Sequence, residues 1–266
     1  MAGKPRHRSG YTPQDTAAVR AACLTVASTL GSHLDNLCIV GGYVPSLLID
    51  QSKSPGVGTE LPHPGTQDLD VALDIGLLDE SQYTEISDRL RREGFTQDVN
   101  ERGNPTPQRW VYGPLNVTVD FLMAPVPGSA KGLRIHKLEG DFGAVVTPGL
   151  TLAFDERQWI EIDGSTMKGE ATTRTIPVCG PGAFTILKAL ALHDRGEPKD
   201  AFDIVYVLRR WPGGVDDIAS RLAHHHSRDS GLIKCALAKL EQDFASVDHI
   251  GPRRAAEFEL GAALLE

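Results

Sequence analysis

The sequence DLDVAL, at residues 68–73, decides how the rest of the chain is read. Apolar side chains occupy every second position from Leu69, and the two acids precede and follow it. This period of two residues is typical of a β-strand with one buried face. Side chains two residues apart on a strand point to the same face, so we expect the carboxylates of Asp68 and Asp70 to lie side by side.

Two neighbouring carboxylates repel, and each raises the pKa of the other unless a cation lies between them. Magnesium ions typically bind one or two such carboxylates together with the phosphates of a substrate. The pair therefore indicates a cation site. The alternative is two solvated acids at the start of an edge strand, and this pair alone does not decide between them.

A second feature is the diglycine Gly41-Gly42, which follows a short apolar run at residues 37–40. The pattern predicts a strand that enters a tight turn, with a short helix after it at residues 43–50. Glycines let a ligand approach the backbone closely, and the start of a helix offers free N–H groups to an anion such as phosphate. A tight turn without a ligand is the alternative.

A third feature is Asp120, a single acid within an otherwise apolar strand pattern at residues 117–122. An ionised carboxylate there is costly unless it is solvated or bound, and pairing with Arg109 is one alternative. Taken together, the diglycine turn and three carboxylates supply a phosphate cradle and metal ligands. Phosphoryl and nucleotidyl transfer need those parts, because paired metal ions can activate an attacking hydroxyl and stabilise the leaving pyrophosphate.

Hydrophobic periodicity and helix-start signals predict a mixed α/β front portion and an all-helical back portion. We expect an α/β domain over residues 1–180 and a helical domain over residues 181–266. The first ten residues are expected to form a frayed tail and residues 51–66 a surface loop, whereas residues 123–180 show no clear order. The expected helices are 13–30, 43–50, 79–93, 184–195, 200–210, 216–226, 232–244 and 255–265, and the expected strands are 37–40, 68–73, 95–99, 108–112 and 117–122.

Composition restricts the class of protein. The 266 residues carry a formal net charge of −8, which makes the chain a poor candidate for a general nucleic-acid coat. The four cysteines form no CxxC pair, so neither a zinc knuckle nor a disulfide framework is indicated. The chain shows no apolar leader and no run long enough to span a membrane. We therefore expect a cytoplasmic protein that makes no membrane contact.

The motifs resemble those of a known family. The diglycine, the Asp68 and Asp70 pair and Asp120 look like the signature of the polymerase-β-like nucleotidyltransferase superfamily. A later block, residues 188–204, is similar to the basic helix and the KDxxD helix of AbiEii-type nucleotidyltransferases. That group includes toxins of bacterial toxin–antitoxin and abortive-infection systems. The resemblance covers roughly residues 37–210. It implies an α+β fold, in which a nucleotidyltransferase-like mixed sheet with flanking helices is followed by a helical C-terminal domain.

The resemblance implies an enzyme that transfers a nucleoside monophosphate from an NTP to an acceptor hydroxyl, such as an RNA or tRNA 3′ end. It implies Mg²⁺ or Mn²⁺ as the cofactor and a cognate antitoxin protein as a partner. Asp68, Asp70 and Asp120 would be the metal ligands and catalytic carboxylates.

The resemblance also implies which residues bind the substrate. Lys188 would act in catalysis and would bind the substrate as well. The other candidate substrate-binding residues are Gly41, Gly42, Tyr43, Arg195, Asp200 and Asp203. Tyr43 stands where the superfamily usually has a small hydroxyl residue.

Three alternative functions stay open at this stage. One is a nucleotidyltransferase that modifies an antibiotic, and another is a catalytically silent module that binds a nucleotide or a partner. A DxD glycosyltransferase is the third, although it leaves the block at residues 188–204 unexplained.

Overall fold

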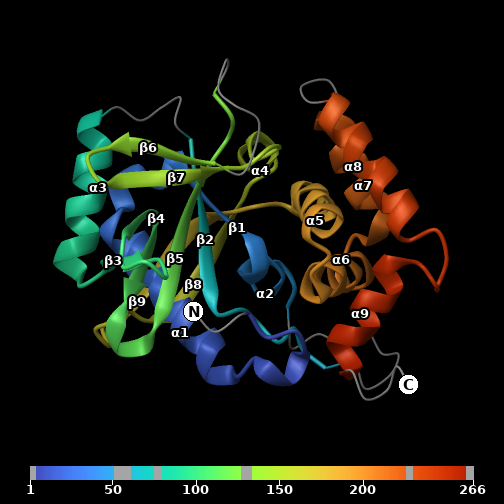
Figure 1. Cartoon of the computed structure of the whole chain (residues 1–266), viewed down its shortest axis with the longest axis horizontal. Helices are drawn as coiled ribbons and strands as arrows, with labels where there is room; N and C mark the ends of the chain where they lie inside the picture. The colour runs from blue at the N-terminus through green and yellow to red at the C-terminus, as the bar shows by residue number, and fades with distance from the viewer. Residues whose placement is uncertain (1–3, 51–60, 75–79, 127–133, 226–229, 262–266) are drawn as a thin grey trace.

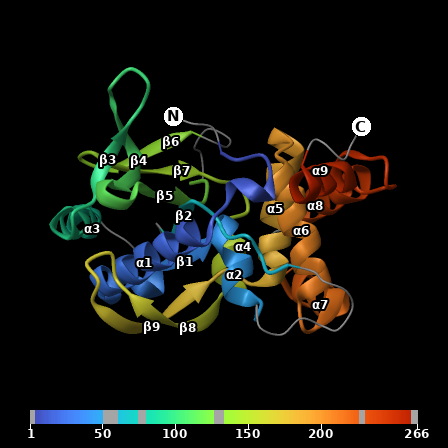
Figure 2. The same ribbon diagram turned by 90° about the horizontal axis from the view of Figure 1, so that it is seen from below.

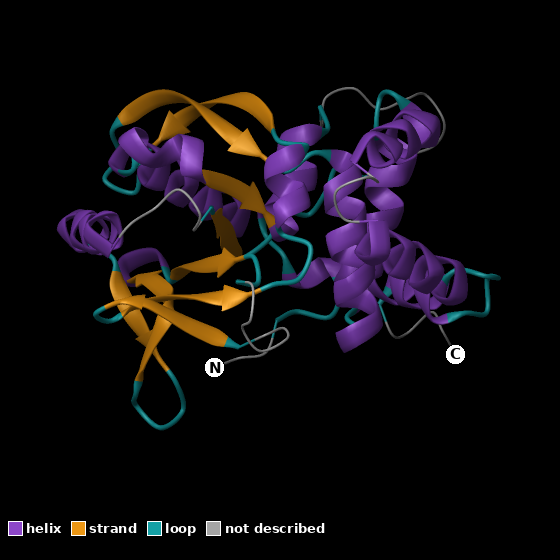
Figure 3. Ribbon diagram, turned by 90° about the horizontal axis from the view of Figure 1, so that it is seen from above, coloured by secondary structure: helices purple, strands orange, loops and turns teal. Residues whose placement is uncertain are grey.

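The structure is a computed structural model that describes residues 4–50, 61–74, 80–126, 134–225 and 230–261. One mixed β-sheet with its flanking helices forms one side of the molecule, and helices α5 to α9 form the other (Figure 1, Figure 3). This arrangement confirms the predicted fold class, including the helical C-terminal region.

The elements of the sheet region are, in chain order, α1 (Pro13–Thr29), β1 (Leu37–Val40), α2 (Val44–Leu48), β2 (Asp68–Leu73), α3 (Glu80–Glu93), β3 (Thr96–Val99), β4 (Pro105–Tyr112), β5 (Val117–Met123), β6 (Ile135–Glu139), β7 (Phe142–Val146), α4 (Thr151–Asp155), β8 (Gln158–Ser165) and β9 (Ala171–Val178). The helical region comprises α5 (Pro181–Arg195), α6 (Pro198–Arg210), α7 (Gly214–His225), α8 (Ser230–Asp243) and α9 (Ile250–Leu260). Short 3₁₀ turns occupy Arg8–Gly10, Gly31–Asn36, Gly41–Tyr43 and Gly113–Leu115.

The strand order β3-β4-β5-β2-β1-β9-β8 places β2 at the middle of the sheet. β2 runs antiparallel to β1 and parallel to β5, and β5 runs antiparallel to β4. Their registers align Val40, Asp70, Asp120 and Arg109 in one row across four strands. Residues paired across strands point to the same face, so this row brings two acids and an arginine to one face of the sheet.

The opposite face of β1 and β2 is apolar and packs on α1. Ile39 and Val71 lie there against Cys23 and Val26 of α1. The view from below shows α1 against the strands, on the side away from the C-terminal helices (Figure 2). Because side chains alternate along β2, burial of Val71 under α1 turns Asp70 toward the other face.

Helix α1 begins as the sequence predicts. Thr12 accepts a hydrogen bond from the backbone of Asp15, and the Asp15 carboxylate accepts one from the backbone of Thr12. Pro13 occupies the first turn, where no backbone N–H is needed. This reciprocal cap satisfies two N–H groups that the helix itself cannot pair.

A buried carboxylate joins the sheet region to the helical region. Glu156, just after α4, accepts hydrogen bonds from the backbone N–H groups of Gly182 (3.1 Å) and Ala183 at the start of α5. A negative charge is favoured at a helix N-terminus, where those N–H groups are otherwise unpaired. Glu156 therefore fixes the start of the helix that carries Lys188.

The structure corrects two expectations and extends a third. Residues 4–10 are not frayed, because Arg6, His7 and Arg8 all bind α9. Within the expected surface loop, residues 51–60 lie outside the described residues, whereas His63 and Thr66 are buried. Residues 123–180, left without an assignment, contain β6 to β9 and α4.

The predicted boundary at residue 180 falls between β9 and α5. One cluster of buried apolar side chains nevertheless extends from Tyr11 to Phe258 and includes residues of both regions. The division into two domains stays a prediction. Among the described helices, none has the length and apolar character needed to cross a membrane.

We predict that Glu156→Ala lowers the free energy of unfolding by roughly 2–4 kcal/mol, because two buried backbone donors lose a charged acceptor. Urea denaturation measures this change. Glu161→Ala is the matched control, since Glu161 is exposed on β8 and its removal should change stability by less than about 0.5 kcal/mol. Equal stability of the two variants would contradict the assigned role of Glu156.

Candidate active site

Three carboxylates converge at the centre of the sheet. Asp68 and Asp70 on β2 and Asp120 on β5 each offer an oxygen, and these oxygens all lie within 4.8 Å of one another. Asp68 and Asp120 are buried, and Asp70 is partly exposed. The parallel pairing of Asp70 with Asp120 produces this convergence. Such a group of oxygens can hold a divalent cation.

Each of the two buried carboxylates has a fixed contact. Thr66 donates a hydrogen bond to Oδ1 of Asp68 at 2.7 Å, and the Lys4 ammonium contacts Oδ2. Arg109 donates from Nε and Nη2 to the two oxygens of Asp120, both at 2.7 Å. The ion pair between Arg109 and Asp120, which the sequence left open as an alternative, is therefore present. The same Asp120 carboxylate also faces Asp70.

The electrostatics of the two β2 carboxylates differ. Burial, together with the charge of Asp68, raises the pKa of Asp70 to about 7. Burial alone would also raise the pKa of Asp68, but the charge and hydrogen bond of Lys4 and the hydrogen bond from Thr66 lower it to about 2. The cluster thus holds excess negative charge that an added cation would stabilise.

The diglycine turn lies directly against this cluster. Gly41 has φ of +72°, and a Cβ atom there would overlap the Asp70 carboxylate. A Cβ on Gly42 would lie 2.9 Å from Thr66 Oγ1 and 3.4 Å from Lys199 Nζ. Only glycine fits both positions, so backbone replaces side chain beside the acids.

Tyr43, expected to bind substrate, is placed elsewhere. Its ring is buried in the hydrophobic core. Burial raises the pKa of Tyr43 well above its ordinary value, and the nearby groups are Cys23 and Arg20 of α1. The Tyr43 hydroxyl therefore faces α1 on the far side of the sheet. The structure does not bring it to the acidic cluster.

A network of charged side chains on α5 and α6 faces the acidic cluster. Lys188 Nζ lies 2.8 Å from both Asp200 and Asp203. Arg195 binds Asp200 through two nitrogens at 2.6 and 2.8 Å, and Lys199 binds Asp203 at 2.8 and 3.0 Å. Three cations with two carboxylates leave the network with an excess positive charge.

The network and the acidic cluster are close enough to influence each other. The positive charge of Lys188 partly offsets the rise in the pKa of Asp70. The positive charge of Lys199 helps to lower the pKa of Asp68. The structure thus places Lys188, Arg195, Asp200 and Asp203 together across from the three carboxylates. The two sides of this site carry opposite charge.

His63 joins the network from the segment before β2. Its Nε2 lies 3.0 Å from Asp203 Oδ1, and its Nδ1 accepts a hydrogen bond from the backbone N–H of Gly65 at 3.1 Å. Because Nδ1 accepts, the neutral ring carries its proton on Nε2 and donates it to Asp203. Burial and the charge of Lys199 lower the pKa of His63 to about 4.

Sequence reasoning missed four contributors to the site: Lys4, His63, Thr66 and Lys199. Thr66 could have been found, because it lies two residues before Asp68 and therefore shares the strand face of the acids. Lys199 stands within the quoted KDxxD block. Lys4 and His63 give no such signal, since their contacts join segments distant in sequence.

Comparison with known proteins places these features in context. The sequence profile described as nucleotidyl transferase AbiEii toxin, Type IV TA system, matches residues 65–259, which is well over half of the chain. No curated protein sequence matches the chain.

Solved structures with some similarity include the antibiotic-resistance factor ANT(2″)-Ia, at 9% identity and a TM-score of 0.39, covering 81% of this chain and 95% of that one. Another is an antigenic nucleotidyltransferase-like protein from Paracoccidioides brasiliensis, at 13% identity and a TM-score of 0.43, covering 96% of this chain and 99% of that one.

The buried neutral His63 predicts a pH dependence of stability. An unfolded histidine has a pKa of about 6.5, whereas that of folded His63 is about 4. The unfolded state therefore binds more protons between these values, and the free energy of unfolding falls as the pH drops through this window. We expect His63→Gln to reduce the decrease in the free energy of unfolding between pH 7 and pH 4 by roughly 3 kcal/mol.

The measurement is urea denaturation of both proteins at intervals from pH 7 to pH 4. The slope against pH is the readout, so a general loss of stability in the variant does not affect the result. His136→Gln is the control, because His136 is exposed on β6. Parallel curves for wild type and His63→Gln would refute the prediction.

Proposed function

The chain belongs to the AbiEii nucleotidyltransferase toxin family, and from that membership we propose that it is a metal-dependent transferase. It moves a nucleoside monophosphate from an NTP to an acceptor hydroxyl and releases pyrophosphate. The observation that carries the proposal is the convergence of Asp68, Asp70 and Asp120 beside the diglycine turn.

The donor set fits a hard divalent cation. All three side chains offer carboxylate oxygens, which suit Mg²⁺ or Mn²⁺. Oδ2 of Asp68 is buried, and its contact among the described residues is the ammonium of the exposed Lys4 side chain, not a further buried donor. Arg109 uses one lone pair on each oxygen of Asp120, and each oxygen retains another.

Asp68, Asp70 and Asp120 would hold the metal ions. When bound, these ions would activate the attacking hydroxyl and stabilise the charge of the leaving pyrophosphate.

The triphosphate is proposed to lie between the sheet and α5. The backbone of Gly41 and Gly42 can approach it closely because neither residue carries a side chain. Lys188, Arg195 and Lys199 supply positive charge from the opposite side. Asp200 and Asp203 hold those cations in place.

The reaction is a substitution at the α-phosphorus of the NTP. The acceptor oxygen forms a bond to that phosphorus, the bond to the bridging oxygen breaks, and pyrophosphate leaves with the bonding electrons. We assign removal of the acceptor proton to Asp120, the third carboxylate of the cluster. Arg109 orients Asp120 through two hydrogen bonds.

The family resemblance favours an RNA acceptor such as a tRNA 3′ end, and the toxin family implies a cognate antitoxin partner. A net charge of −8 disfavours a broad nucleic-acid footprint. We therefore propose that the 3′ end alone enters the site, where α5 and α6 supply local positive charge. The reaction is placed in the cytoplasm, which contains both substrates.

We predict that Asp70→Asn abolishes transfer, with a loss of about 10³-fold or more, because the metal contribution to charge stabilisation is worth several kcal/mol. The assay incubates the protein with each labelled NTP, total cellular RNA and Mg²⁺ or Mn²⁺, and follows label into RNA.

Asp163→Asn is the matched control for this substitution. Asp163 is an exposed acid on β8 that pairs with Arg20, on the α1 side of the sheet. The Asp163→Asn substitution should leave transfer unchanged. If wild type and Asp70→Asn label RNA equally, or if neither gives a labelled product, the proposed reaction is wrong.

A second prediction concerns Thr66, whose hydroxyl orients Asp68. We expect Thr66→Val to weaken Mn²⁺ binding about 10–100-fold, the usual cost of removing a hydrogen bond to a metal ligand. Thr66→Ser keeps the hydroxyl and should stay close to wild type. Isothermal titration calorimetry measures both affinities, and a Val variant that binds as tightly as the Ser variant would contradict the role.

A further inference from the structure

A lysine from the start of the chain reaches the acidic cluster. Lys4 Nζ contacts Oδ2 of Asp68, the oxygen to which Thr66 does not donate. The Lys4 side chain remains 58% exposed, so it approaches from solvent on its flexible stem. The Lys4 ammonium thus occupies a position where a metal ion bound by Asp68 would lie.

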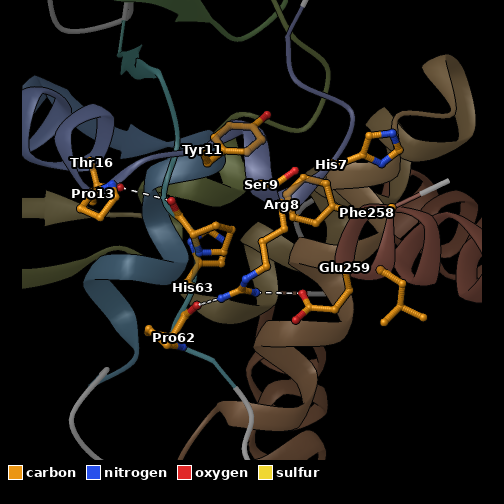
Figure 4. Close-up of a pocket in the computed structure, with 13 residues that line it drawn as sticks. His7, Arg8, Ser9, Tyr11, Pro13, Thr16, Pro62, His63, Phe258 and Glu259 are labelled. Atoms are coloured by element: carbon orange, nitrogen blue, oxygen red, sulfur yellow. Dashed lines mark hydrogen bonds and ion pairs between the residues drawn. The ribbon is translucent and has the colours of Figure 1, made fainter. Parts of the chain in front are cut away.

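The segment around Lys4 is held from the helical side. Arg6 pairs with Glu257 at 2.9 Å, and Arg8 pairs with Glu259 at 2.8 Å. Arg8 also donates to the carbonyl of Pro62, so its guanidinium reaches between Pro62 and Glu259 (Figure 4). These contacts tie residues 6–8 to α9 and to the segment before β2.

Next to Lys4, the Tyr11 hydroxyl donates to the carbonyl of Pro5 at 3.1 Å. This hydrogen bond holds the backbone of the residue that follows Lys4. The contact with Asp68 is therefore made by an anchored segment.

The same segment borders open space. A cavity of about 600 Å³ lies between residues 7–11, residues 62–64 and α9 (Figure 4). None of its described lining residues is one of the three clustered aspartates. The Lys4 side chain is 58% exposed, so its ammonium can move away from Asp68 into solvent without unpacking the hydrophobic core.

Charge disfavours joint occupancy of Asp68 Oδ2 by the Lys4 ammonium and a metal ion. An ammonium and a divalent cation on the same carboxylate repel each other strongly at contact distance. We propose that Lys4 is a resident counter-ion of the acidic cluster, which a divalent cation must displace before the site becomes active. This inference rests on the proposed function, since it concerns the cation site of that reaction.

The test compares the affinity of the full-length protein for Mn²⁺, without nucleotide, by isothermal titration calorimetry. Removal of a competing cation should tighten binding, so Lys4→Gln is expected to bind Mn²⁺ about tenfold more tightly than wild type, equivalent to about 1.4 kcal/mol. Lys168→Gln is the matched control. It removes one positive charge from a lysine that pairs with Glu93, away from the cluster, and should bind as wild type does.

A second variant releases the segment without changing any charge. Tyr11→Phe keeps the aromatic ring but loses the hydrogen bond to Pro5. We expect it to shift Mn²⁺ affinity in the same direction as Lys4→Gln and by a smaller factor.

The outcomes separate this inference from the proposed function. If wild type binds Mn²⁺, Asp70→Asn does not, and Lys4→Gln binds no more tightly, the role of Lys4 is overturned and the metal site stands. If Lys4→Gln binds Mn²⁺ more weakly than wild type, Lys4 does not compete with the metal ion and the proposal is likewise wrong. If no variant binds Mn²⁺ at all, both proposals fail.

Discussion

Repulsion among three neighbouring carboxylates is the constraint to which the rest of the site responds. The parallel pairing of β2 with β5 fixes Asp70 opposite Asp120, and the strand period adds Asp68 on the same face. Clustering three ionised carboxylates at one partly buried site is unfavourable unless positive charge lies nearby. The fold supplies that charge from two directions, with Arg109 from the sheet and Lys4 from the start of the chain.

The helical region balances the same charge from across the site. Lys188 and Lys199 approach the acids, and buried carboxylates of α6 fix their positions. Breaking a buried ion pair by removing one partner leaves an uncompensated charge, which is strongly destabilising. The network is therefore both a source of positive potential and a rigid part of the fold. Glu156 sets its position by fixing the first turn of α5.

Local patterns in the sequence were sufficient to predict the strands that carry the acids, the start of α1 and the helical block from α5 onward. These patterns failed where a prediction depends on the direction in which a side chain points or on contacts between segments distant in sequence. Tyr43 follows the diglycine in sequence, yet the turn sends its ring into the core beneath α1. β6 to β9 lie in a stretch rich in glycine and proline whose periodicity is weak. Lys4 meets Asp68 through a segment that α9 and Tyr11 hold, and no short window of sequence contains both residues.

The contact between the first residues and α9 also has a consequence for the order of synthesis. Lys4 is translated before the strands of the sheet and Glu257 after them, and the cationic residues of α5 and α6 also follow the whole sheet. A nascent chain that carries all three acids therefore has Lys4 and Arg109 to pair with them but still lacks Lys188, Arg195 and Lys199.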